Sequence, residues 1–143
     1  MSKLETPMIL AYWDQVGGTL IEEFQLVQGD GLCGPRRADA LILLGRERRR
    51  VPAGDRSVNV EGEKVVVVQA KAHRLGMYLM GQGVFSAELM KRFKPKSIKS
   101  TILCTKDDAV LRPLLAPFPN VEVVVMKEFA LAKRARGAGS SSG

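Results

Sequence analysis

Three polar residues stand in or beside apolar stretches of the sequence, where packing alone gives no reason for them. Asp39 lies near the start of an apolar run, and Gln69 and Lys71 follow four consecutive valines. Side chains alternate between the two faces of a strand, so Gln69 and Lys71 share a face. A carboxylate, an amide oxygen and the Ala70 carbonyl suit a hard cation such as Mg²⁺ (or Mn²⁺). A lysine beside that cation can orient water or stabilise charge on a phosphate.

These side chains can act together only if the strands that carry them are neighbours. Asp39 belongs to a predicted strand over residues 38–44, and Lys71 to one over residues 64–72. Residues 45–63 are rich in arginine and contain proline and glycine, which indicates a long excursion between the two strands. In an antiparallel pair, the start of one strand lies beside the end of the other. The polar residues would then converge at one edge of the sheet.

The rest of the chain predicts an α/β fold with a mixed sheet flanked by helices. Thr6 is expected to cap a first helix, with Pro7 at its first position, and Gly17 and Gly18 end it. The first three strands have no helix between them, which favours an antiparallel meander. The last two strands are reached through helices, which favours parallel pairing. The expected elements are a helix over 6–16, strands over 19–27, 38–44 and 64–72, a helix over 75–93, a strand over 98–105, a short helix over 105–115 and a strand over 121–126.

A further carboxylate is needed if the site holds a metal. Strict alternation along residues 19–27 places Glu22 on the same face as Leu20, Phe24 and Leu26. A carboxylate among such side chains needs a partner or a metal, so Glu22 is the favoured candidate. Glu23 and Glu5 are the alternatives to Glu22. A surface salt bridge for Glu22 or Glu23, or a helix-start charge for Glu5, is the simpler structural explanation.

The composition favours an anionic partner. Lys and Arg number 22 against 15 Asp and Glu, giving a formal net charge of +7 and a pI of about 9.7. Nucleic acid, and DNA first, is the simplest partner for such a chain. Contacts are expected from polar residues near the predicted site and along the excursion, although the arginines could be merely solvated, and His73 and Gln82 could be structural. The candidates are Arg36, Arg37, Arg46, Arg48, His73 and Gln82.

Length and cysteine usage predict one domain in a reducing compartment. We expect a single domain over residues 1–132 and a disordered, basic, low-complexity tail over residues 133–143. Cys33 and Cys104 are far apart and have no metal-site spacing, so free thiols and a cytoplasmic location are expected. No apolar run approaches the roughly 20 residues of a membrane helix, so no membrane partner is expected.

The order of the elements resembles the PD-(D/E)XK nuclease superfamily, which includes restriction endonucleases and archaeal Holliday-junction resolvases. The similarity covers about residues 5–126 as an order of elements: helix, strand, strand with Asp, strand ending in (Glu/Asp)-x-Lys, helix and strand. Arg37-Ala38-Asp39 stands where the family has Pro-Asp, and Gln69 replaces the usual acidic residue, as in some members. The resemblance implies metal binding by Asp39 and Gln69 and a catalytic role for Lys71.

The expected function is therefore that of a Mg²⁺-dependent DNA nuclease, in DNA repair, recombination or defence. A homodimer or a partner protein would let so small a domain cut both strands of a duplex. Loss of a charge at Gln69 motivates the main alternative, a non-catalytic DNA-binding or assembly module that keeps the nuclease fold. A plain α/β domain that binds a small ligand or a protein partner is the other alternative.

Overall fold

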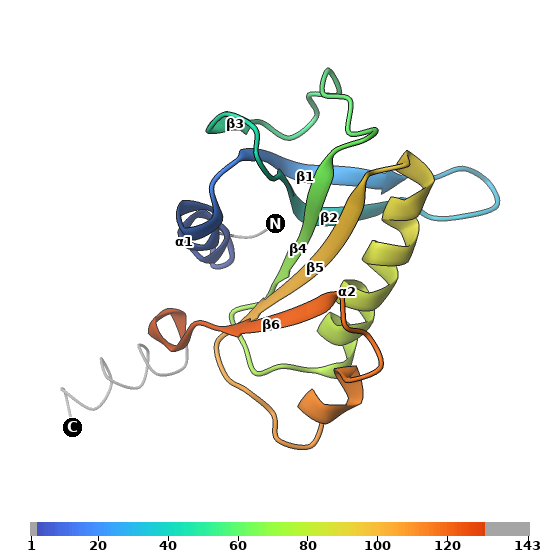
Figure 1. The fold of residues 1–143 in the computed structure, drawn as a ribbon. Coiled ribbons are helices and arrows are strands. Elements are labelled where there is room, and N and C mark those ends of the chain that lie inside the picture. Colours follow the sequence, from blue (N-terminus) through green and yellow to red (C-terminus); the bar gives the residue numbers. More distant parts are fainter. Residues whose placement is uncertain (1–2, 131–143) are drawn as a thin grey trace.

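A mixed six-stranded sheet forms the centre of the molecule (Figure 1). The structure is a computed structural model that describes residues 3–130. The strands lie in the order β3-β1-β2-β4-β5-β6. Their bounds are Thr19–Val27 for β1, Arg36–Leu43 for β2, Arg49–Val51 for β3, Lys64–Ala70 for β4, Ser97–Cys104 for β5 and Val121–Val125 for β6.

The pairing confirms the two halves of the predicted sheet. β1, β2 and β4 form an antiparallel meander, and β4, β5 and β6 pair in parallel. β4 lies between β2 and β5, and residues 65–70 are all buried. A strand covered on both faces is expected to be apolar along its whole length, which explains the run of valines.

The predicted excursion contains a strand that the sequence did not reveal. β3 pairs in parallel with the start of β1, where Leu20 lies opposite Arg50. Thr19 helps to hold this segment, because its hydroxyl donates a 2.8 Å hydrogen bond to the Glu47 carbonyl oxygen. Three residues are too few to show an alternating pattern, so this edge strand had been expected as loop.

The predicted alternation along β1 is wrong beyond its middle. Leu20 packs in the cluster beneath the first helix, whereas Phe24 and Leu26 pack with Ile21 in a cluster on the opposite face. The change occurs at Glu23, whose φ of 47° is in the left-handed region that few non-glycine residues adopt. This irregularity turns Phe24 and Leu26 away from Leu20.

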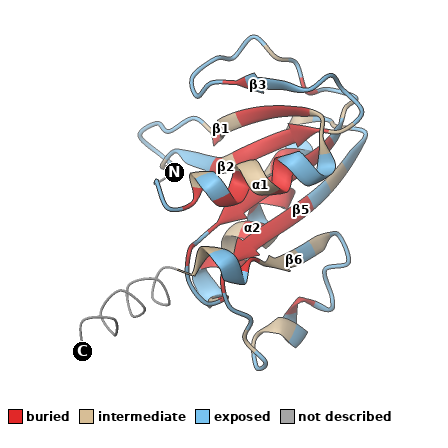
Figure 2. Cartoon of the chain, turned by 90° about the vertical axis from the view of Figure 1, so that its left-hand side faces the viewer, coloured by how far each residue is buried: buried red, intermediate tan, exposed pale blue. Residues whose placement is uncertain are grey.

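Helix α1 (Thr6–Val16) covers one face of the sheet, and Figure 2 shows its buried side turned toward the strands. The helix begins at Thr6, and Glu5 takes the cap position that had been predicted for Thr6. It ends as expected, because the Gly17 N–H donates to the Trp13 carbonyl oxygen at 2.8 Å. Its buried residues are Met8, Ile9, Tyr12 and Trp13.

Helix α2 (Met77–Met90) covers the other face and continues into the short 3₁₀ helix η1 (Lys91–Phe93). The observed helix therefore begins two residues later than predicted, and its last three residues form a 3₁₀ helix in place of an α-helix. A Cβ on Gly83 would lie 2.5 Å from the Cδ1 atom of Ile102 on β5. The Gly83 carbonyl also accepts a 2.7 Å hydrogen bond from Ser100. Glycine at this position thus allows the helix to lie close against β5.

The short helix predicted over residues 105–115 is wrong. Asp108 accepts hydrogen bonds from the N–H groups of Val110 and Leu111, at 3.0 and 2.9 Å. Only the 3₁₀ helix η2 (Arg112–Leu115) follows, and Pro113 within it has no N–H to extend a helical ladder. A further 3₁₀ helix, η3 (Lys127–Phe129), follows β6.

Three sequence expectations concern the chain as a whole. Both cysteines are free, as predicted, with Cys33 exposed and Cys104 buried. Within residues 3–130, no helix has the length and apolar character needed to cross a membrane. The predicted tail over residues 133–143 lies outside the described residues.

Candidate functional site

Asp39 lies where β2 and β4 separate. The ladder between these strands runs from Leu43 opposite Val65 to Ala40 opposite Val68, and Asp39 is the next residue. In place of a ladder bond, the Asp39 carboxylate accepts a 2.9 Å hydrogen bond from the Ala70 N–H. The Asp39 side chain thus bridges the two strands at the edge where the sequence placed it.

Gln69 meets Asp39 through the backbone. Its amide oxygen accepts a 3.4 Å hydrogen bond from the Asp39 N–H, and its amide nitrogen donates to the Ser86 hydroxyl of α2 at 2.7 Å. The Gln69 side chain is buried, with 1% of its surface exposed. Both ends of the amide are therefore engaged within the protein. These bonds give Gln69 the role of connecting Asp39 to α2, and its role as a metal ligand stays a prediction.

The surroundings of Asp39 act on its pKa in opposite directions. Burial raises the pKa of the Asp39 carboxyl above its usual value. The hydrogen bond from Ala70 and the positive charge of Lys71 act in the opposite direction, while the negative charge of Glu5 raises the pKa further. Lys71 and Glu5 therefore both lie within electrostatic reach of Asp39, and Lys71 is exposed directly after β4.

The charge of Glu5 acts on Asp39, and Glu22 lies opposite Ala40, the neighbour of Asp39 on β2. Glu22 forms an ion pair with Arg50 of β3. Glu5 is 7% exposed and lies at the cap position of α1. Glu22 is half-buried, and its pairing with Arg50 of the unforeseen strand matches the simpler explanation, a salt bridge, so its role at a metal stays a prediction. The sequence signal for Glu5 was its place immediately before the first helix.

The predicted nucleic-acid contacts divide into two groups. Arg36 and Arg37 begin β2, and His73 follows β4, so these three exposed residues belong to the end of the sheet that carries Asp39. Arg46 is paired with Glu63 at 2.6 Å, outside this group. The two remaining candidates are Arg48, which pairs with Asp14 and lies 4.0 Å from the Trp13 ring centre, and Gln82, which is half-buried on α2.

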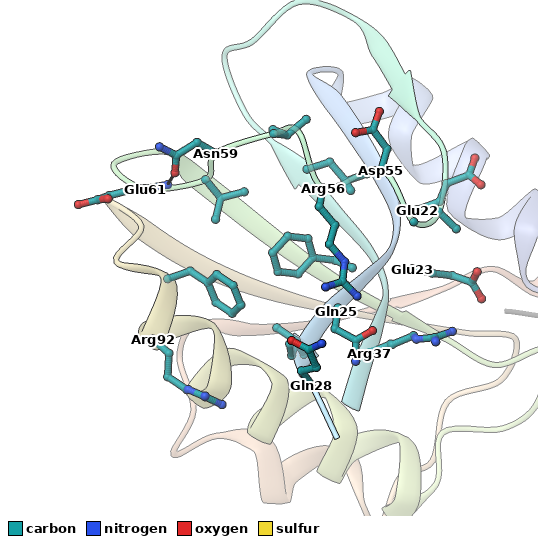
Figure 3. A pocket seen from close by; sticks show the side chains of 18 of the residues that line it. Glu22, Glu23, Gln25, Gln28, Arg37, Asp55, Arg56, Asn59, Glu61 and Arg92 are labelled. Carbon is teal, nitrogen blue, oxygen red and sulfur yellow. Dashed lines mark hydrogen bonds between the residues drawn. The ribbon is translucent and has the colours of Figure 1, made fainter. Parts of the chain in front are cut away.

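A pocket that the sequence did not indicate lies beside this region (Figure 3). It has a volume of ≈ 840 Å³ and is bounded by β1, the loop over residues 53–61 and η1. Arg37, two residues from Asp39 on β2, is part of its lining. The break in alternation at Glu23 explains why the sequence gave no signal, because strict alternation sends Phe24 and Leu26 to the wrong face.

The acidic groups near this edge suit only a metal ion that takes one or two ligands from the protein. Within residues 3–130, no three His, Cys, Asp or Glu side chains are grouped so as to hold a metal ion. Mg²⁺ commonly takes one or two protein carboxylates and completes its coordination with water and substrate phosphate oxygens. The repulsion between Asp39 and Glu5 is the kind that a cation relieves, so these two residues fit that mode of binding.

No protein-family model, curated protein or solved structure matches this chain.

Proposed function

We propose that this α/β protein is a Mg²⁺-dependent DNA nuclease of the restriction-endonuclease-like type. The observation that supports this proposal most strongly is the arrangement at Asp39. A half-buried carboxylate bridges two separating strands, with the charges of Lys71 and Glu5 acting on it. A carboxyl with a raised pKa, held with other charged groups at one edge of a sheet, is typical of functional sites. The mixed sheet, with a helix on each face, is compatible with the element order of that nuclease superfamily.

The chain's own residues would each have a distinct role. Asp39, with Glu5 beside it, would hold the cation, and a bound Mg²⁺ would supply Lewis-acid polarisation of the scissile phosphate. Lys71 would orient a water molecule for in-line attack, or would stabilise negative charge as it develops on the phosphate. Gln69 and Ser86 act indirectly, because their hydrogen bonds fix the backbone of Asp39.

The surroundings suit a polyanionic substrate. Arg36, Arg37 and His73 are exposed at the same end of the sheet as Lys71, and the whole chain has a formal net charge of +7. Contacts between such cations and backbone phosphates position nucleic acid without reading its sequence. DNA binding by this surface should weaken steeply as the salt concentration rises. A dimer or a partner protein would be required for cleavage of both strands.

Two observations favour a second function, a nucleic-acid-binding module without catalysis. Gln69 is neutral and engaged with Ser86, and the described residues offer no group of three metal-binding side chains. Such a module would keep the fold and the basic residues. It would bind DNA with no requirement for a divalent cation.

A cleavage assay tests the catalytic proposal. The purified chain is incubated with Mg²⁺ or Mn²⁺ and a panel of duplex, single-stranded and branched DNA, with RNA for comparison. The Asp39→Asn and Lys71→Ala variants should lose activity by about 100-fold or more, as expected when one electrostatic group is removed. Lys64→Ala is the matched control, since Lys64 is an exposed lysine at the opposite end of the same strand. Equal activity of the Lys71→Ala variant and the wild type would refute the assignment.

A further inference from the structure

The pocket beside β1 is separate from the Asp39 site. Its volume of ≈ 840 Å³ is within the roughly 300–1,000 Å³ that is typical of small-molecule sites. Asp39, Gln69 and Lys71 do not line it. The pocket lies on the face of the sheet that carries Met90 of α2, and it is a concave feature with its own chemistry.

Aromatic rings form one corner of this pocket. The rings of Phe24 and Phe93 meet edge to face, with centroids 5.1 Å apart and planes inclined at 66°. Both phenylalanines are only half-buried, although buried apolar residues such as Ile21 and Leu26 pack beside them. A half-buried ring keeps part of its surface open, and planar heterocycles stack well on such a surface.

Cations surround the aromatic corner. Arg37, Arg56, Arg92 and Lys94 line the pocket, and all four are exposed. Within residues 3–130, none of them forms an ion pair. Figure 3 shows the Arg56 side chain extending from the loop across the pocket toward Gln25 of β1. A guanidinium in this position can bind a phosphate through two parallel N–H groups.

The acidic residues of the lining lie away from Arg56. Glu23 also lines the pocket, and its charge acts on Arg37. Glu22 is paired with Arg50, which is not part of the pocket. Asp55 accepts a 2.9 Å hydrogen bond from the Ser57 N–H. Glu61 lies at the outer rim in Figure 3, away from Arg56. The centre of the pocket is therefore the place where an anionic group would meet Arg56.

Two amide side chains add hydrogen-bonding groups with fixed orientation. The Gln25 amide nitrogen donates to the Val27 carbonyl at 2.6 Å, and the Asn59 amide oxygen accepts from the Glu61 N–H at 3.0 Å. These bonds involve opposite ends of the two amides. The Gln25 oxygen thus remains as an acceptor and the Asn59 nitrogen as a donor, which is the pairing that recognises the edge of a nucleobase.

We infer that this pocket binds a nucleotide, with the base against Phe24 and Phe93 and the phosphate at Arg56. A purely apolar ligand would leave Arg56 without a counter-charge, and a bare anion would make no use of the aromatic corner. The nucleotide can be a free molecule or one unstacked unit of a strand, since both present the same base and phosphate. This inference does not depend on hydrolysis at Asp39.

Titration of the full chain, followed by ¹H–¹⁵N NMR spectra, tests the inference. The probes are AMP, GMP, CMP and UMP, with adenosine, ribose 5-phosphate and inorganic phosphate as partial ligands and a short single-stranded oligodeoxynucleotide as the strand form. At least one mononucleotide or the oligonucleotide should shift the signals of Phe24, Arg56 and Phe93 in a saturable way. Saturation by mononucleotides identifies a free-nucleotide site, and saturation by the oligonucleotide alone identifies a strand site. Equal binding of inorganic phosphate, or no shift with any probe, would overturn the inference.

Matched arginine variants distinguish binding in the pocket from non-specific electrostatic binding to the basic surface. Arg56→Gln should weaken binding of the saturating probe at least tenfold, because it removes a charge-assisted hydrogen bond to the phosphate. Arg74→Gln removes the same charge from an exposed residue that follows β4 outside the pocket, and it should leave binding unchanged. Equal losses in the two variants would contradict a built site. Phe93→Leu should weaken binding of the nucleotide and leave binding of ribose 5-phosphate unchanged. If Phe93→Leu unfolds, the Arg56→Gln variant still tests the inference.

Discussion

The hydrogen bond between Gln69 and Ser86 is the most direct structural test of how the site is held. Replacing Ser86 with alanine removes the acceptor used by the Gln69 amide nitrogen at 2.7 Å. Gln69 and Ser86 are 1% and 5% exposed, so bulk water has little access to the donor left behind. The variant therefore leaves a buried N–H group without its partner.

The size of the effect follows from two opposing contributions. An unsatisfied buried donor costs about 1–3 kcal/mol. Alanine is a better helix former than serine, which returns about 0.5 kcal/mol because residue 86 lies within α2. The free energy of unfolding should fall by about 0.5–2.5 kcal/mol, which lowers the melting temperature of a domain of this size by about 2–10 °C.

Denaturant unfolding of a double-mutant cycle measures this coupling. Ser86→Ala, Gln69→Leu and the double variant should give a coupling energy of about 0.5–3 kcal/mol. Ser97→Ala changes an exposed serine of β5 and should alter stability by no more than about 0.5 kcal/mol. The amide signal of Asp39 should also move in the Ser86→Ala variant and not in the Ser97→Ala control. A coupling energy of zero, with an unmoved Asp39 signal, would refute the role given to Gln69.

Three further predictions concern packing, pH and thiol chemistry. In Gly83→Ala the new Cβ would lie 2.5 Å from the Ile102 Cδ1 atom, which costs about 1–3 kcal/mol, and alanine returns about 1 kcal/mol as the better helix former. Denaturant unfolding should show a loss of stability of up to about 2 kcal/mol, and a gain of about 1 kcal/mol would contradict this tight packing. Because the pKa of Asp39 is raised, the folded protein holds the proton of this carboxyl more tightly than the unfolded chain does. The contribution of Asp39 to stability therefore falls as the pH rises from about 3.9 through the folded-state pKa. Asp39→Asn should lack that part of the slope in urea unfolding from about pH 3 to about pH 7, and identical slopes would disagree with it. A thiol reagent should label exposed Cys33 in the folded protein and reach Cys104 only after unfolding, since burial both shields that thiol and raises its pKa; equal labelling rates would argue against it.

The convergence of Asp39 and Gln69 could be predicted because it needs only antiparallel pairing of two clearly apolar strands. The start of β2 and the end of β4 must then lie at one edge, and Asp39 and Ala70 do meet there. The direction of the Gln69 side chain could not be predicted in the same way. It depends on Ser86, which lies on a helix whose rotation against the sheet is set by packing such as that of Gly83 on Ile102.

The errors in the predicted site have two local causes. Glu23 adopts a left-handed backbone angle, and no glycine or asparagine marks that position in the sequence. The faces assigned to the second half of β1 were therefore reversed, which hid the pocket. β3 is too short to be recognised, so the pairing of Glu22 with Arg50 could not be foreseen. Tertiary contacts, and not local preference, decide both features.

Calorimetric titration with Mn²⁺ tests the central claim most directly, because a metal-dependent nuclease must bind its cation where Asp39 and Glu5 lie. The full chain should bind Mn²⁺ at low millimolar concentration or tighter in the presence of a DNA fragment, and the Asp39→Asn variant should lose this binding. Lys64→Ala should bind as the wild type does. Salt-dependent DNA binding with no Mn²⁺ binding, or Mn²⁺ binding that the Asp39→Asn variant retains in full, would contradict the proposed catalytic site.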